Sequence, residues 1–316
     1  MKIGYFLSCE EYGPAELLRQ AKQAEDAGFQ NLWISDHFHP WVDAQGESPF
    51  VWSVIGALSQ VTERMTVTTG VTCPTVRIHP AIIAQAAATS AAMLPGRFQL
   101  GVGSGEALNE HILGDAWPPA NVRLEMLEEA VEVIRELWTG KQVEHYGTHY
   151  AVENARIYTL PDEPPPILVS GFGPKATELA ARIGEGYCTV GPDKELIGLY
   201  REKGGKGPVQ AGTKVCYGPD KAAAVKTVKE IWPNEGMSGE LAQILPNPAH
   251  FEQTAEMVTE EMIAEAVPCG PDLDEHIAAI QEFADAGVDE LFIQQIGSEH
   301  DDFFKVFASE VLPRFA

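Results

Sequence analysis

Apolar and polar positions along the chain follow two alternating periods. Short runs rich in β-branched or aromatic residues give way to longer stretches with helical spacing of the apolar residues, clearest at 14–27 and 124–138. Eight runs are predicted strands, at residues 2–7, 31–35, 65–71, 97–103, 166–171, 186–190, 213–218 and 290–295. Strands that alternate with helices predict βαβ units around a parallel sheet. Eight units predict an α/β fold, a closed (β/α)8 TIM barrel with its active site at the carboxyl ends of the strands.

Two stretches do not fit this repeat. Residues 142–160 read as a β-hairpin that turns near Gly147. Residues 231–264 form a longer insertion before the last barrel unit, and insertions of this kind commonly build substrate pockets or lids. We therefore expect residues 1–316 to form a single barrel domain that carries these two insertions.

The charge and cysteine content narrow the range of partners. The 316 residues contain 46 Asp and Glu against 22 Lys and Arg, a formal net charge of −24, which opposes a sequence-independent grip on nucleic acid or an anionic membrane. The five cysteines include no C-x-x-C pair and fit a reducing cytoplasm. No apolar run is long enough for a signal peptide or a membrane span. We expect a soluble cytoplasmic protein that acts on a small molecule.

Charged and titratable residues follow the second predicted strand directly, in the stretch WISDHFHPW. Such groups are costly to desolvate at the end of a buried strand, so they usually mark a site. The imidazole of a histidine such as His37 can accept a proton from an alcohol, and Asp36 lies beside it. His39 precedes a proline and is interpreted as a turn residue, whereas Trp41 fits either the site or the core.

A metal site is the alternative interpretation of the same stretch. His37 and His39 are two residues apart, so on an extended chain they face the same way and could ligate zinc. Further ligands would have to come from later strands, whose ends carry Ser170, Thr189 and Gln294. Because none of these completes a zinc site, we expect no metal.

Two glycine-rich stretches follow later predicted strands. In GVGSGEALNE (101–110) the glycines let the backbone approach a flat ligand, and Glu106 and Asn109 offer a carboxylate and an amide. The stretch is no dinucleotide fingerprint, because Glu106 occupies the third glycine position. Glu106 is either a solvated loop acid or the acid opposite His37. The second stretch, SGFGPKATELAARIG (170–184), opens a helix whose backbone N–H groups could bind phosphate.

These motifs together resemble those of a known family. SDHFHPW, TCPTVRIHPAIIAQ, GVGSGEALNE and SGFGP occur in the order and spacing found in the luciferase-like (bacterial luciferase-type) barrel superfamily. Within it, the chain resembles the coenzyme F420-dependent dehydrogenases, which include F420-dependent glucose-6-phosphate dehydrogenases and F420-dependent secondary alcohol dehydrogenases. The similarity covers nearly the whole chain.

The resemblance implies specific roles for residues of this sequence. His37 would be the base that takes the hydroxyl proton while hydride passes from the carbinol carbon to C5 of coenzyme F420. Trp41 would help to hold the reacting centre, Glu106 would be the acid near the deazaflavin, and Gly70 and Val71 would form a cis peptide on which the ring leans. Contacts with the coenzyme would come from Asp36, Gly70, Val71, Cys73, Ser104, Gly105, Asn109, Gly171, Phe172 and Gly173.

This chain differs from some members of the family at positions that bind the substrate. Where sugar-phosphate members hold the phosphate with two lysines and an arginine, this chain has Pro192, the 242–243 region and Glu265. Lys194 lies near the first of these positions and is the one candidate to replace a missing lysine. Loss of these cations would leave a phosphate dianion unpaired. We therefore favour an uncharged or secondary alcohol. The alternatives are an F420-dependent glucose-6-phosphate dehydrogenase, an FMN-dependent luciferase-like monooxygenase or reductase, and a coenzyme-binding barrel without turnover. By analogy with the family, we expect a homodimer.

Overall fold

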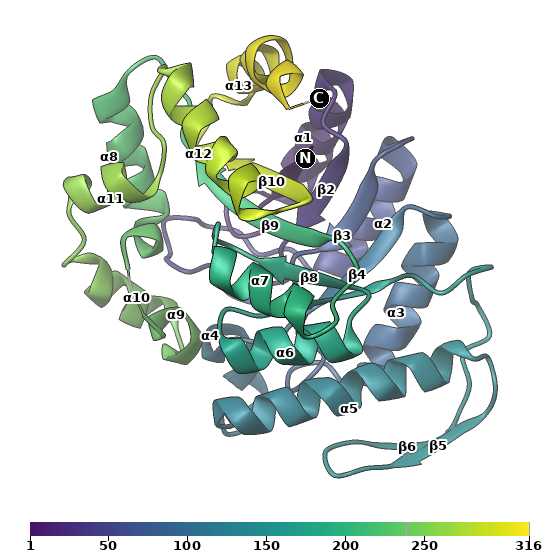
Figure 1. Cartoon of the computed structure of the whole chain (residues 1–316). Coiled ribbons are helices and arrows are strands. Elements are labelled where there is room, and N and C mark those ends of the chain that lie inside the picture. Colours follow the sequence, from purple (N-terminus) through teal and green to yellow (C-terminus); the bar gives the residue numbers. More distant parts are fainter. Residues whose placement is uncertain (238, 316) are drawn as a thin grey trace.

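The protein is a closed barrel of eight parallel strands, seen from one end in Figure 1, in a computed structural model that describes residues 1–237 and 239–315. Around the barrel the strands follow the order β1-β10-β9-β8-β7-β4-β3-β2. Their bounds are β1 Lys2–Leu7, β2 Asn31–Ile34, β3 Thr66–Thr69, β4 Phe98–Val102, β7 Ile167–Ser170, β8 Gly186–Thr189, β9 Val209–Val215 and β10 Glu290–Gln295. The predicted (β/α)8 fold class is therefore confirmed.

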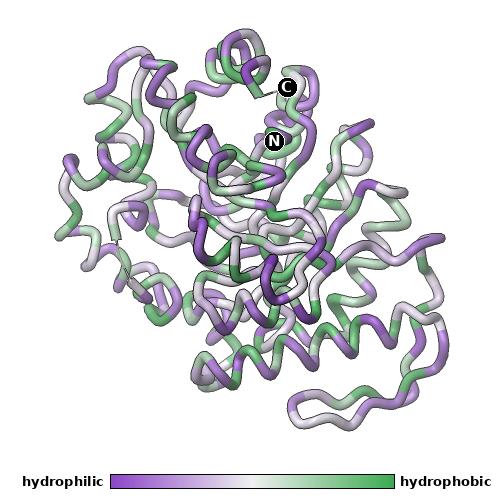
Figure 2. Tube along the Cα trace, viewed as in Figure 1, coloured by the Kyte–Doolittle hydropathy of each residue, from purple (hydrophilic) through white to green (hydrophobic). Residues whose placement is uncertain are grey.

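Helices between the strands form the outer layer. They are α1 Pro14–Ala27, α2 Val51–Val61, α3 Pro80–Met93, α5 Ala120–Trp138, α6 Pro174–Ile183, α7 Lys194–Glu202, α8 Lys221–Ile231, α12 Leu273–Ala286 and α13 His300–Val306. Along α5, hydrophobic and hydrophilic positions alternate (Figure 2), and the apolar ones pack on the barrel. Helix α1 ends where predicted, because Gly28 adopts the left-handed conformation (φ 96°) that closes a helix.

A small apolar cluster fills the inside of the barrel. The Trp33 ring stacks on Phe292 with centroids 4.8 Å apart, and its Nε1 donates to Gln210 Oε1 at 2.7 Å. An added Cβ on Gly212 would lie 2.9 Å from the Trp33 ring, so only glycine fits there. This packing explains an error in the predicted strand bounds. Strand β9 begins at Val209 and not at residue 213, because a glycine that looks like a loop residue is required inside the barrel.

Two segments lie between the barrel units and are not part of the barrel. Strands β5 (Val143–Tyr146) and β6 (Ala151–Ala155) pair antiparallel, and the N–H of Gly147 donates to the Tyr150 carbonyl. The second insertion is helical, with a 3₁₀ turn at Pro233–Gly236 followed by α9 Leu241–Ile244, α10 Pro248–Ala255 and α11 Glu260–Ala266. Shorter helical segments are α4 Ala107–Glu110, His111–Leu113, Phe307–Val311 and Leu312–Arg314.

The second insertion joins the barrel through an apolar cluster of its own. Trp232 and Phe251 are buried and pack in the same cluster as Trp41 and Leu108 from the loops after β2 and β4. The Trp41 and Phe251 rings meet edge to face, 5.1 Å between centroids. The insertion thus covers the end of the barrel that carries the stretch after β2.

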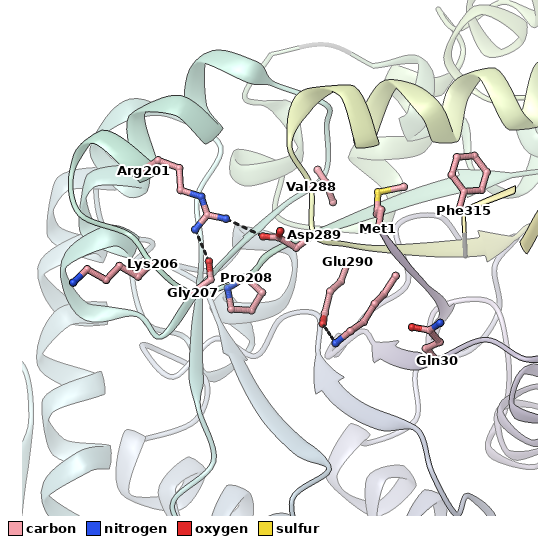
Figure 3. Close-up of a pocket in the computed structure, with 11 residues that line it drawn as sticks. Met1, Gln30, Arg201, Lys206, Gly207, Pro208, Val288, Asp289, Glu290 and Phe315 are labelled. Carbon is pink, nitrogen blue, oxygen red and sulfur yellow. Dashed lines mark hydrogen bonds and ion pairs between the residues drawn. The ribbon is translucent and has the colours of Figure 1, made fainter. Parts of the chain in front are cut away.

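A surface pocket lies at the opposite end of the barrel (Figure 3). It is lined by residues at or just before the first positions of the strands, such as Lys2, Pro208 and Glu290. Four of its charged side chains form two ion pairs, Arg201 with Asp289 and Lys2 with Glu290, and Lys206 lies at the rim. The amino-terminal ends of barrel strands generally serve stability rather than chemistry, so we assign this pocket no catalytic role.

Among the residues described, no helix combines the length and apolar character needed to cross a membrane.

Candidate active site

The histidine after β2 lies between two carboxylates at the carboxyl end of the barrel. His37 Nε2 is 3.3 Å from Glu10 Oε1 and 3.5 Å from Glu106 Oε2. Glu10 comes from the loop after β1 and Glu106 from the loop after β4. The pairing of β1 with β2, and the curvature of the sheet from β2 through β3 to β4, bring these three loops together.

Glu10 is a further candidate residue of the site, and the sequence motifs did not point to it. Its Oε2 accepts hydrogen bonds from Ser8 Oγ at 2.8 Å and from Ser35 Oγ at 2.6 Å, so both hydroxyls orient the carboxylate toward His37. The sequence did contain a signal. Ser8 and Glu10 follow a buried strand directly, just as Asp36 and His37 do.

The His37 ring is held from its other side as well. Its Nδ1 lies 3.1 Å from the carbonyl of His39, which can only accept, so Nδ1 carries the hydrogen. The Trp41 ring packs against it at 5.0 Å between centroids. His39 turns away and bonds the Leu108 carbonyl at 2.9 Å, in agreement with its predicted turn role. The two histidines therefore do not converge on a common metal position.

Glu106 occupies the position expected of an acid facing His37. Its carboxyl has a raised pKa, first because of burial and then because Glu10 and Glu110 are close, while His37 opposes the shift. The Nδ2 of Asn109 donates to Glu106 Oε2 at 3.2 Å, and the Oδ1 of Asn109 accepts from the backbone N–H of Phe38 at 2.9 Å. Asn109 thereby ties the loop after β4 to the loop after β2.

Asp36 is engaged in a buried ion network beneath these loops. Its carboxylate accepts from Thr72 Oγ1 at 2.7 Å and from Arg77 Nη2 at 2.9 Å. Arg77 also bonds Glu110 through its backbone N–H at 2.7 Å. Burial alone would lower the pKa of Arg77, but the Asp36 and Glu110 carboxylates raise it, so the guanidinium stays charged. The network fixes where the carboxyl ends of β2, β3 and β4 lie.

The backbone after β3 adopts the unusual form that the resemblance implied, because the Gly70–Val71 peptide is cis. The loop after β4 packs closely on it. An added Cβ on Gly103 would lie 2.8 Å from Val71 Cγ2, and one on Gly105 (φ 81°) would lie 2.5 Å from Cys73 Sγ. The glycines of GVGSGEALNE therefore bring the strand ends into close contact.

The glycine loop after β7 leaves room in front of α6. An added Cβ on Gly173 would meet nothing within 4 Å, whereas one on Gly171 would clash with the backbone of Ala176. The Phe172 side chain is 49% exposed. Ser170 lies beside Gly103, 3.6 Å from the ideal Cβ position, so this loop borders the loop after β4. Open space before a helix start fits a phosphate-bearing coenzyme.

The arrangement can hold and move protons beside a flat ligand. His37, Glu10 and Glu106 can share a proton beside the glycine-rich segments that follow β3 and β4. Among the described residues, no group of three or more His, Cys, Asp or Glu side chains is arranged to hold a metal ion.

Comparison with known proteins gives a consistent result. A relative from Microbacterium testaceum named F420-dependent glucose-6-phosphate dehydrogenase is 38% identical, with 99% of this chain and 97% of the relative covered. A solved F420-dependent secondary alcohol dehydrogenase in complex with an F420-acetone adduct is 33% identical, with a TM-score of 0.92 over 100% of this chain and 99% of its own. The F420-dependent tetrahydromethanopterin reductase of Methanopyrus kandleri, at 21% identity and a TM-score of 0.80 with both chains fully covered, shares the fold. The luciferase-like monooxygenase family matches residues 1–290, and the chain therefore belongs to this family.

Proposed function

We propose that the protein is a coenzyme F420-dependent dehydrogenase that oxidises the hydroxyl-bearing carbon of an uncharged or secondary alcohol. The observation that carries the proposal is the position of His37 between Glu10 and Glu106 at the end of the barrel. A barrel that only stored a coenzyme would need neither the base nor the paired carboxylates.

His37 is the base of the proposed reaction. Because Nδ1 donates to the His39 carbonyl, the lone pair of the neutral ring is on Nε2, which faces the two carboxylates. When Nε2 accepts the hydroxyl proton, the positive ring is stabilised by Glu10, whose own orientation is fixed by two serine hydroxyls. Trp41 closes the side of the ring toward the insertion and helps to exclude water.

Glu106 is the proposed acid for the reverse direction. Burial raises the pKa of its carboxyl, which favours the protonated form that an acid requires. Asn109 holds one of its oxygens. Because Glu106 is only partly buried, its carboxyl can contact a bound ligand.

The structure fits the coenzyme at the residues named for it. Coenzyme F420, when bound, supplies the hydride acceptor, and the protein supplies orientation and protection from water. Gly70, Val71, Cys73, Ser104 and Gly105 would line one side of the coenzyme. The phosphate of the coenzyme would lie at Gly171, Phe172 and Gly173. Asp36 and Asn109 would act mainly by fixing the strand ends and loops through their hydrogen bonds.

The choice of an uncharged substrate is supported by the state of the nearby cations. Lys214 pairs with Glu235, Arg77 pairs with Asp36, and Arg123 is buried under Trp117 with its Nη2 on Gln243. Glu265, at a place where sugar-phosphate members have a cation, is exposed and acidic. Lys214 and Arg77 are each already paired with a carboxylate, against which a phosphate dianion would have to compete.

Glucose-6-phosphate is the second candidate substrate, because full-length relatives at 33–38% identity carry that activity in their names. The two candidates separate in one assay. Purified protein with oxidised F420 is offered isopropanol, larger secondary alcohols and glucose-6-phosphate in parallel. Bleaching of F420 with neutral alcohols alone supports the proposal, and bleaching with glucose-6-phosphate alone contradicts the substrate assignment. Titration of the apoprotein with F420 and FMN separately tests the coenzyme.

Localisation and assembly are also proposals. A reducing cytoplasm is supported by the five cysteines, which are all buried and unpaired. A homodimer is proposed by analogy with the family. Light scattering on a sizing column gives the mass, and a monomer would contradict the second proposal.

A further inference from the structure

Two polar side chains lie next to each other inside the mouth of the barrel. Lys214 on β9 and Gln294 on β10 are register partners. Two earlier pairs on the same strands, Gln210 with Glu290 and Gly212 with Phe292, face the barrel interior, where they contact the Trp33 ring or one another. Since side chains on a strand alternate between its two faces, Lys214 and Gln294 face inward as well, one layer closer to the active site.

Gln294 has an unsatisfied acceptor. The residue is fully buried, and its Nε2 donates to Glu11 Oε2 at 3.3 Å. Glu11 also accepts from Trp232 Nε1 at 2.7 Å and from the N–H of Gly297 at 2.8 Å, and both of these groups can only donate. The Glu11 carboxylate therefore fixes the amide with Nε2 toward itself. Gln294 Oε1 has no partner in the described part of the chain, an arrangement that costs free energy unless a ligand or water donates to it.

Lys214 supplies a donor beside this acceptor. Its Nζ lies 2.8 Å from Glu235 Oε1 and 4.5 Å from the centre of the Trp232 ring. The side chains of Lys214 and Glu235 remain 17% and 25% exposed, although Lys214 lies on an inward-facing strand position. Lys214 is therefore not fully enclosed, and an ammonium with three N–H groups retains donors after pairing with Glu235.

This polar pair is close to the proposed reacting centre. Glu11, which holds Gln294, directly follows Glu10, whose carboxylate is 3.3 Å from His37. The Trp232 ring, over which the Lys214 ammonium lies, packs in the same apolar cluster as Trp41. Trp41 in turn contacts His37.

We propose that Lys214 and Gln294 form a subsite for a second hydroxyl group, so that the substrate is a neutral diol or polyol rather than a plain aliphatic alcohol. This inference rests on the proposed function and names its substrate class. One hydroxyl can satisfy both residues, because its oxygen accepts from Lys214 while its hydrogen is donated to Gln294 Oε1. The ion pair with Glu235 neutralises the charge of Lys214, and Glu11 and Glu235 would repel a phosphate.

The test uses alcohols that differ by one hydroxyl at a time. Isopropanol, propylene glycol and glycerol are compared as substrates by the bleaching of oxidised F420, in the wild type, Lys214→Met and Gln294→Leu. A site built to bind a hydroxyl discriminates strongly against the analogue that lacks it. We expect kcat/KM for propylene glycol to exceed that for isopropanol by about tenfold or more in the wild type, and the difference to fall to about twofold or less in each variant, mainly through KM.

The controls separate this inference from the proposed function. Lys226→Met, which removes an exposed lysine from α8, should keep the wild-type preference. Coenzyme titration and thermal unfolding establish that each variant is folded, and Lys214→Met carries the test if Gln294→Leu does not fold. Equal kcat/KM for isopropanol and propylene glycol in the wild type, or a preference that survives in both variants, overturns the subsite but leaves the dehydrogenase intact.

A binding measurement tests the subsite even if the protein shows no turnover of these alcohols. Calorimetric titration of the protein with propylene glycol and with isopropanol measures the subsite directly. Tighter binding of the diol without any bleaching of F420 would support the subsite while the proposed function fails. Equal binding without bleaching would overturn both.

Discussion

The replacement Glu10→Gln isolates the contribution of one carboxylate to the proposed base. Glutamine keeps the size of the side chain and removes its charge. The two serine hydroxyls that donate to Glu10 Oε2 can rotate to suit an amide, so the loop after β1 should keep its form. The variant should therefore bind coenzyme like the wild type and lose only the stabilisation of a positively charged His37.

The size of that loss follows from the geometry. Two unit charges at the 3.3 Å separation of His37 Nε2 and Glu10 Oε1 attract by about 5 kcal/mol at an effective dielectric constant of about 20. This is an upper bound, because glutamine keeps a dipole and Glu106 also faces the ring. Hydrogen bonds to charged groups contribute about 1.5–3 kcal/mol net. A loss of about 2 kcal/mol corresponds to an approximately thirtyfold lower kcat.

The assay is the steady-state rate of F420 bleaching at saturating alcohol. Glu144→Gln is the matched control, since it removes a carboxylate from an exposed position in the hairpin. Glu10→Asp keeps the charge and should retain more activity than Glu10→Gln. If folded, coenzyme-binding Glu10→Gln has the same kcat as Glu144→Gln, the electrostatic role of Glu10 is refuted.

Three further changes test other parts of the structure. His37→Ala should retain coenzyme binding and lose turnover, and unchanged turnover would remove His37 from the role of base. Gly101→Ala places a Cβ against the Thr69 carbonyl, so urea unfolding should show a loss of more than about 2 kcal/mol, whereas Gly198→Ala on α7, with nothing near the added Cβ, should be neutral or slightly stabilising. Burial lowers the pKa of His300 to about 4, so below the unfolded value of about 6.5 the unfolded chain binds a proton that the folded protein does not. The wild type should therefore lose about 3 kcal/mol of stability, relative to His300→Gln, as the pH falls from about 6.5 to about 4, and parallel stability curves for the two proteins would contradict this.

The sequence predicted much of the architecture because the patterns that encode it are local. Strand and helix periods, the glycine that ends α1 and the hairpin around Gly147 each depend on a few neighbouring residues. The exception is β9, whose first half contains a glycine that the sequence presents as a loop residue. Only the Trp33 ring inside the closed barrel explains that glycine, and Trp33 is far from it in the sequence.

For the candidate site too, some features could be predicted from the sequence and others depended on the tertiary structure. The sequence by itself determined which residues follow the ends of buried strands, and so it made His37, Trp41, Glu106 and Asn109 candidates for the site. The tertiary structure decided which of them meet. The pairing of neighbouring parallel strands placed Glu10 against His37, directed Asp36 into an ion pair with Arg77, and set Lys214 beside Gln294. Distances between loops that are far apart in the chain depend on the register and curvature of the whole sheet, and no local pattern of residues carries that information.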